Sequence, residues 1–239
     1  MTDPAEIALE GSPTDLVAES LDYIRAHFLT LGQLADWTGV PPGAISSYIA
    51  YRCIPRESYT VSRVAEIESF FGHITGAREV VRYYAPSHVQ WVLDTSRAAR
   101  LQPLEQIAAA RRDAFCRDYA EEARRIGADL LRPDELETLA QQEYESWLDG
   151  TYGLCTRTAT ATDIARKEIS ILRIKQLTNG GTKAAISQAD RDALQAAMTI
   201  LDDVASPFAP HERPHSSRAK WIEAIARMPG TERPSVTPV

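Results

Sequence analysis

Apolar residues recur along most of the chain with the spacing of amphipathic helices, and the two-residue alternation typical of β-strands is scarce. In the first hundred residues, Thr14 or Asp15 can cap the first helix and Gly72 can end the fourth. The pattern predicts helices over residues 14–28, 31–37, 43–52, 61–71 and 86–99.

The second part of the chain shows the same helical spacing. Because proline is tolerated in the first turn of a helix, Pro103 and Pro133 can each start a long one. Two glycines after Asn179 form a strong helix stop. The remaining predicted helices cover residues 162–177, begin at Ser187, and begin after Ser216 or Ser217 with Trp221, Ile222 and Ile225 on the apolar face.

These elements predict an all-α (mainly α) multi-helix protein with a helix-turn-helix-like segment near its N-terminus. Two irregular, loop-like stretches interrupt the helical pattern in the C-terminal half, over residues 150–158 and 206–218. The predicted organisation is a disordered lead over 1–13, a helical domain over 14–100, a second helical domain over 101–228, and a tail over 229–239.

Composition restricts the class of protein. The chain has 239 residues, of which 44% are hydrophobic and 25% are charged, as expected for a globular protein with a proper core. No apolar run approaches the ~20 residues that a membrane span needs, and the N-terminus does not have the pattern of a signal peptide. Three widely spaced cysteines do not form a disulfide framework, so we expect a cytoplasmic protein without a membrane partner.

The segment Leu29–Ile54 resembles the helix-turn-helix of small transcription regulators. A recognition helix contacts bases and phosphates through basic and amide side chains. No lysine or arginine lies between Arg25 and Arg52, and the second helix offers serines and tyrosines instead. The formal net charge of −7 also argues against a nucleic-acid partner. We therefore expect this segment to serve as a scaffold or as a surface for a partner protein.

The string His211-Glu212-Arg213-Pro214-His215 contains the letters of the H-E-x-x-H zinc signature. That chemistry requires both histidines on one face of a helix. Pro214 lies inside the string, and proline inside a helix costs about 3 kcal/mol. Pro210 precedes the string as well. The segment is therefore predicted to be extended rather than helical, and no metal site is expected.

The same stretch is better suited to binding an anion. Ser216 and Ser217 stand where a helix begins, and the N-terminus of a helix presents free backbone N–H groups. Arg213 and Arg218 flank them and can bind anionic oxygens with two hydrogen bonds. An ordinary helix cap with solvated arginines is the structural alternative. Two candidate catalytic groups, His211 and Glu212, and a further imidazole, His215, make the functional interpretation stronger.

The second irregular stretch has a similar character. Its two glycines, Gly150 and Gly153, allow a close approach of the backbone to a ligand. Tyr152, Cys155 and Arg157 supply polar groups, and we place them among the candidate binding residues. Cys155 could act as a nucleophile only beside an activating group, and a buried structural role is the alternative that we favour.

Three strings, IPRESYTV, TYGLCTR and SPFAPHERPHSSR, resemble a bacterial family of natural-product biosynthesis proteins of unknown function. The resemblance spans residues 23–227. Within such families the chain is similar to the smaller subunit of the aziridine synthases of azinomycin-type pathways. Those are two-protein enzymes that close an aziridine ring by displacing sulfate from an amino-sulfate ester.

The resemblance implies an enzyme subunit that needs no cofactor, acts on a small anionic substrate and binds a second protein subunit. It implies that Arg157, Arg213, Ser216, Ser217 and Arg218 hold the sulfate or another anionic group. His211 or Glu212 would then orient or deprotonate the attacking amine. The alternatives are a transcriptional regulator that uses the helix-turn-helix, and a non-catalytic scaffold that stabilises a partner enzyme.

Overall fold

A computed structural model describes residues 12–183 and 186–226. The predicted lead up to residue 11 and the predicted tail over 229–239 lie outside the described residues. The chain divides into two compact units. The first comprises residues 12–26, 116–141 and 155–226, and the second comprises residues 27–115 and 142–154. Whereas the sequence suggested a division near residue 100, the units divide inside two long helices, α5 (Leu104–Gly127) and α6 (Pro133–Leu148).

The structure is mainly helical, as predicted, but it also contains a three-stranded antiparallel sheet, so the all-α assignment holds only roughly. The helix predicted over residues 61–71 is wrong. This segment is strand β2 (Tyr59–Ser69), which pairs along its length with strand β3 (Gly72–Tyr84). Valine, isoleucine and tyrosine favour strands when a partner strand is available. That partner begins at Gly72, which pairs with Ser69 directly after the hairpin turn and does not end a helix.

The predicted helix-turn-helix is confirmed as a structural element. Helices α2 (Leu31–Thr38) and α3 (Pro42–Ala50) are separated by Gly39, whose φ of 66° suits glycine. Thr30 and Gln33 form a capping box at the start of α2. The short strand β1 (Leu29–Thr30) pairs with the end of β3, giving the sheet order β1-β3-β2.

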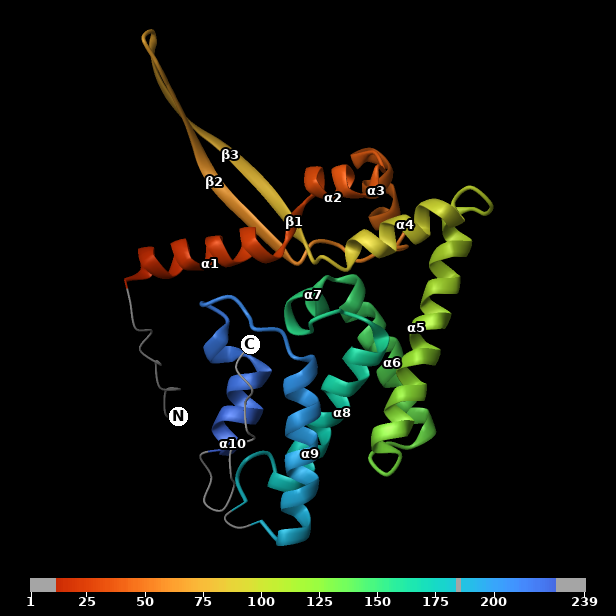
Figure 1. The fold of residues 1–239 in the computed structure, drawn as a ribbon. Coiled ribbons are helices and arrows are strands. Elements are labelled where there is room, and N and C mark those ends of the chain that lie inside the picture. The colour runs from red at the N-terminus through yellow and green to blue at the C-terminus, as the bar shows by residue number, and fades with distance from the viewer. Residues whose placement is uncertain (1–11, 184–185, 227–239) are drawn as a thin grey trace. The chain divides into compact units, whose positions relative to one another are not determined.

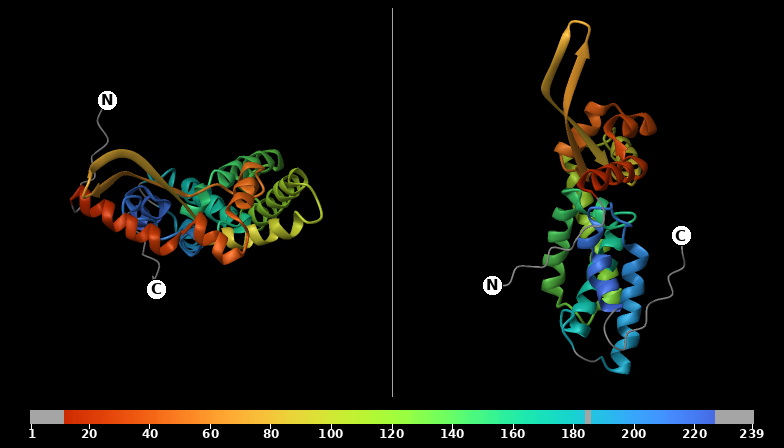
Figure 2. Two further views of the ribbon diagram at one scale, coloured as in Figure 1. Left: turned by 90° about the horizontal axis from the view of Figure 1, so that it is seen from above. Right: turned by 90° about the vertical axis from the view of Figure 1, so that its left-hand side faces the viewer.

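Along the chain, the two helices are followed by a β-hairpin that consists of β2 and β3 (Figure 1). Figure 2 shows the hairpin extending away from α2 and α3. The core of this unit lies beneath the two helices and is completed by α4 (His88–Ala98). Its buried members are Leu29, Leu34, Val40, Ile45, Tyr48, Cys53, Ile54, Tyr84, Val92 and Ile107.

The first compact unit is built around two long helices, α8 (Ala161–Thr178) and α9 (Gln188–Val204), which pack along each other (Figure 1). Both were predicted, and their ends follow the local sequence. Ser187 accepts a hydrogen bond from the backbone of Asp190, and Asn179 ends α8 in the left-handed conformation. The core between them contains Ile171, Ile174, Ile186, Leu194, Ala197, Met198, Leu201, Trp221, Ile222 and Ile225.

Three further parts complete this unit. Most of helix α1 (Pro13–His27) belongs to it, and so do residues 116–141, which contain the end of α5 and the start of α6. The last described elements are a short 3₁₀ turn, η1 (Arg213–His215), a π-helical stretch, η2 (Ala219–Glu223), and α10 (Ala224–Ala226). Among the helices that the structure describes, none is both long enough and apolar enough to cross a membrane.

Candidate functional site

The two irregular stretches singled out in the sequence meet in the first unit. The backbone amide of Ser206 donates to the carbonyl of Cys155 at 3.2 Å, and the amide of Arg157 donates to the carbonyl of Val204 at 3.0 Å. Thr156 and Ala205 form the β-bridge between these bonds. We call this contact between residues 155–157 and 204–206 the junction.

Two strained backbone positions flank the junction. Ala159 has a φ of 52° and Phe208 a φ of 59°, a region that costs a non-glycine residue about 1–2 kcal/mol. Both side chains are buried, so packing holds them in place. The amide of Ala159 also donates to Thr156 Oγ1 at 3.0 Å, which fixes the bend directly after the junction. Strain of this kind is concentrated at functional sites.

A cluster of ionisable groups lies around Cys155. Burial raises the pKa of its thiol, while the charges of Lys167, Glu168 and Glu212 are close enough to influence that pKa as well. Lys167 Nζ lies 2.5 Å from Glu168 Oε1, and the Lys167 side chain is only 9% exposed. A buried ammonium group requires such a carboxylate partner. The raised thiol pKa keeps Cys155 protonated at neutral pH, which argues against a nucleophilic role and favours the structural one.

Helix α1 supplies polar partners to the loop that follows the junction. Ser20 Oγ lies 2.9 Å from His211 Nδ1. The hydroxyl of Tyr23 is hydrogen-bonded to the side chain of Ser206, and burial raises its pKa. The charges of Glu212 and Arg213 also act on that pKa, so both residues lie near the tyrosine. Residues from both ends of the chain therefore build one polar site.

The zinc-like string adopts a conformation that differs from the predicted extended one. Residues Arg213–His215 form a single 3₁₀ turn, in which the amide of His215 donates to the carbonyl of Glu212 at 2.9 Å. Glu212 Oε2 accepts from the amide of Ala209 at 3.2 Å, closing the turn from the other side. The two histidines are therefore not on one face of an α-helix. Within the described residues, no group of three or more His, Cys, Asp or Glu is placed to hold a metal ion.

Three of the predicted anion-binding residues, Ser216, Arg218 and Arg213, have individual structural partners. Ser216 caps the last helical segment, as predicted, because its Oγ accepts from the amide of Ala219 at 3.1 Å. Arg218 Nη1 lies 2.5 Å from Asp202 Oδ1, so a carboxylate already neutralises this arginine. Arg213 Nε donates to the carbonyl of Phe208 at 3.3 Å. Ser217 Oγ is buried and has no hydrogen-bond partner among the described atoms.

Within the part of the chain that the structure describes, the remaining candidate residues contribute no side chain to the polar groups around the junction. The side chains of Arg157 and His215 are exposed, although the backbone of Arg157 belongs to the junction. Tyr152 belongs to the second compact unit, where its hydroxyl donates to the carboxylate of Glu143. Gly150 does allow a close backbone approach, but to Glu57 of the same unit rather than to a ligand: an added Cβ would lie 2.4 Å from the Glu57 carbonyl oxygen.

Sequence reasoning missed Lys167, Glu168, Ser20 and Tyr23. A signal for Lys167 is present in the sequence, because it shares a helical face with Ile164, three residues before it, and Ile171, four residues after it. Burying a lysine on the apolar face of a helix costs free energy unless a carboxylate pairs with its ammonium group. Ser20 and Tyr23 carry no comparable signal, since the contacts of α1 with residues 206–213 are made across most of the chain.

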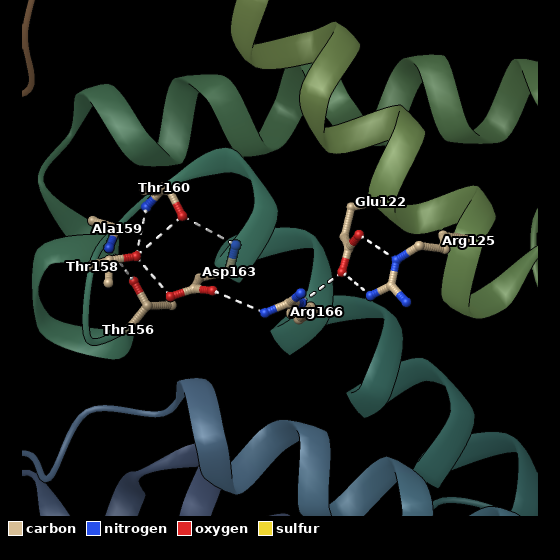
Figure 3. A network of polar contacts seen from close by, with 8 residues as sticks. All are labelled: Glu122, Arg125, Thr156, Thr158, Ala159, Thr160, Asp163 and Arg166. Carbon is tan, nitrogen blue, oxygen red and sulfur yellow. Dashed lines mark hydrogen bonds and ion pairs between the residues drawn. The ribbon is translucent and has the colours of Figure 1, made fainter.

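A second network of polar contacts holds the segment that follows the junction (Figure 3). Arg166 Nε donates to Glu122 Oε1 at 2.6 Å, and Arg166 Nη1 lies 3.8 Å from Asp163 Oδ1. Asp163 Oδ2 in turn accepts from the hydroxyl of Thr158 at 2.6 Å. Arg125 also binds Glu122, and the two arginines hold the pKa of this carboxyl below its usual range. The network ties α5, α8 and residues 156–160 together.

Comparison with curated proteins and with solved structures finds no match to this chain. One protein family does match, and the matched segment includes the junction together with Cys155, Lys167 and Glu212. The matching family is described as a family of unknown function (DUF6058), and the matched segment is residues 111–228.

Proposed function

We propose that this chain is a subunit of a cofactor-independent biosynthetic enzyme, and that its site is the polar cluster around the junction. The observation that carries the proposal is the convergence of Lys167, Glu168 and Glu212 on Cys155, in a segment with strained backbone on both sides. Such a cluster suits a small substrate that carries both an anionic group and an amine. The free cysteines are consistent with a reducing, cytoplasmic setting.

The groups of the cluster have two roles: some are cations that can bind an anionic group, and others are bases that can accept a proton. Lys167 is the buried cation and is paired with Glu168, so the anionic group would bind it by sharing or displacing that carboxylate, with Arg213 as a more exposed second cation. His211 and Glu212 are the candidate bases, and His211 Nε2 lies 4.0 Å from Glu212 Oε1. Ser20 holds the other nitrogen of His211, which orients the imidazole.

The finer proposal follows the resemblance to aziridine synthase subunits and concerns the reaction itself. The lone pair of a neutral amine attacks the neighbouring carbon, the carbon–oxygen bond to sulfate breaks, and sulfate leaves with the bonding electrons. The amine proton passes to His211 or Glu212, so no cofactor or oxidant is required. Holding the amine and the sulfate in line is a positioning effect, which can lower the barrier by several kcal/mol.

A direct test measures sulfate release from an amino-sulfate substrate by the full chain, alone and together with the protein encoded next to it. We expect Glu212→Gln and Lys167→Met to lower kcat/KM by about a hundredfold or more. Two matched controls lie outside the cluster: Lys175→Met, an exposed lysine on the same helix as Lys167, and Glu223→Gln, an exposed carboxylate. Both controls should retain activity.

The outcomes separate the alternatives. If neither the chain nor the pair releases sulfate, the aziridine proposal is wrong. If the pair is active and all four variants retain full activity, this chain is a scaffold for a catalytic partner. If only the cluster variants lose activity, the site lies in this chain.

A transcriptional regulator is the second candidate, and the helix-turn-helix followed by a hairpin is the observation that favours it. The charges argue against it, because three of the arginines in or next to these elements already have carboxylate partners. These pairs are Arg52 with Glu145, Arg63 with Glu79, and Arg82 with Glu57. A mobility-shift assay at low salt tests it, and salt-sensitive DNA binding would replace the enzyme proposal.

A further inference from the structure

The β2–β3 hairpin exposes an unusual amount of apolar surface. Among its described side chains, none between Thr60 and Arg82 is buried. Phe70 and Phe71 at its tip are 97% and 95% exposed, and the Ile74 and Val64 side chains on the strands are 67% and 61% exposed. The third strand, β1, pairs only with Tyr83 and Tyr84 at the base of β3.

This hairpin lacks what normally stabilises a pair of strands. An isolated two-stranded hairpin is marginally stable in water, and a third strand or a packed face is usually needed. Both outer edges of the hairpin are unpaired above the base, so each offers a row of free backbone N–H and C=O groups. Unpaired edges combined with exposed phenylalanines indicate a surface that another polypeptide covers.

The balance of charges on the hairpin restricts the class of molecule that can bind it. Strands β2 and β3 carry three arginines and three glutamates. Arg63 Nε lies 2.6 Å from Glu79 Oε2, and Arg82 Nε lies 3.3 Å from Glu57 Oε1, just outside the strands. A surface neutralised in this way has no excess positive charge for nucleic acid or anionic lipid. Because the arginines and glutamates of the two strands balance, two copies of this surface do not repel each other through a net charge.

The exposed area of the hairpin approaches what a dimer interface needs. Phe70 and Phe71 alone expose about 400 Å² at the typical area of an aromatic side chain. Val64, Ile74 and the strand backbones add to this value. Specific interfaces bury about 800 Å² on each partner, so one hairpin can supply most of a dimer interface.

We propose that the β2–β3 hairpin binds the same hairpin of a second copy of this chain, forming a symmetric homodimer. The free strand edges extend the sheet across the two-fold axis, and the exposed apolar side chains, with Phe70 and Phe71 at each tip, are covered by the partner. This contact is independent of the junction and of the proposed reaction.

Sedimentation velocity of the full chain over a series of concentrations tests the proposal. The wild-type protein should sediment with twice the mass of one chain. The double variant Phe70→Asp/Phe71→Asp and the single variant Val64→Lys should sediment as monomers, with self-association weakened on the order of a hundredfold or more for the double variant. Leu101→Asp is the matched control, because Leu101 is 89% exposed but lies outside the hairpin.

Circular dichroism should show the same helical content in all of these variants, because the altered side chains are exposed. A wild-type chain that remains monomeric throughout the series would overturn the proposal, whether it then binds lipid vesicles, DNA or neither. A dimer that persists in both the double variant and Val64→Lys would overturn it as well. Loss of the dimer in Leu101→Asp would show that the effect is not specific to the hairpin and would also contradict it.

Discussion

The carbonyl oxygen of Cys155 accepts a hydrogen bond from the backbone amide of Ser206 at 3.2 Å. This bond joins the segment after α7 (Thr151–Cys155) to the loop after α9, and it uses no side chain. The junction should therefore survive replacement of the side chains around it. Each polar group of the candidate site can then be tested without loss of the local backbone arrangement.

The thiol of Cys155 should react slowly in the native protein. Burial raises its pKa, so the thiolate fraction at neutral pH is small. We expect alkylation of Cys155 at pH 7 to be at least about tenfold slower in the native chain than in the urea-unfolded chain. Peptide mass spectrometry distinguishes it from Cys53 and Cys116. Cys155→Ala should keep its activity, and rapid alkylation with loss of activity would restore the nucleophile hypothesis.

The carboxylate of Glu122 should contribute measurably to stability. Its side chain is 10% exposed and binds two arginines, so Glu122→Gln should lower the free energy of unfolding by about 1–3 kcal/mol. Arg125 and Arg166 hold its pKa below the usual value of 4.5, so this stabilisation is present above pH 4.5 and is lost as the pH falls through the native pKa.

Urea unfolding of Glu122→Gln at neutral and acidic pH checks both effects. The variant should lose less stability on acidification than the wild-type chain does. The exposed neighbour Glu121 provides a matched control, because Glu121→Gln should change stability by less than about 0.5 kcal/mol. Equal effects of the two substitutions would contradict the role of the network.

Gly150 should tolerate no side chain. Its φ is 80°, and a Cβ would lie 2.4 Å from the carbonyl oxygen of Glu57, so Gly150→Ala should cost about 2–4 kcal/mol. Gly180 has a similar φ of 67° but open space around it. Gly180→Ala should therefore cost only about 1 kcal/mol. Thermal unfolding of both variants measures the difference, and equal costs would show that the Glu57 contact relaxes freely.

Buried His88 should make stability depend on pH. Its ring nitrogens lie 3.0 Å from the carbonyl of Ala85 and 3.1 Å from that of Pro55, and burial lowers its pKa from 6.5 to about 4. The native state therefore resists protonation that the unfolded state accepts. Stability is full above pH 6.5 and falls as the pH decreases toward 4, by about 3 kcal/mol in total.

Urea unfolding between pH 4 and pH 7 measures this slope. His88→Gln has no titrating ring, so its stability should change less over that range than the stability of the wild-type chain. An unchanged slope in the variant would assign the pH dependence to other groups.

The sequence predicts the helices well because their ends are encoded locally. Helix α8 was predicted over residues 162–177 and spans Ala161–Thr178, since Thr160 caps its start and Asn179 ends it. The β2–β3 hairpin was missed because a strand needs a partner that a local pattern does not reveal. Val61 and Val64 also fit the spacing of a helix, and only their pairing with residues 78–81 decides for a strand.

The candidate site was predicted only in part. His211, Glu212 and Arg213 could be proposed together because they lie in one dense polar string. Their neighbours Tyr23 and Lys167 were missed, because proximity between distant segments is a property of the packed helices. Arg218 was assigned to an anion on its residue type, whereas Asp202 on the preceding helix already binds it.

Helix α1 lies outside the segment matched by the family but contributes side chains to the candidate site within it. The family match begins at residue 111, yet Ser20 and Tyr23 on α1 bind His211 and Ser206 inside the matched segment. A shortened chain that starts at residue 111 would also begin in the middle of α5. We therefore expect that the matched segment does not form the complete site by itself. Its polar loop acquires its full set of partners only when the N-terminal helix is present.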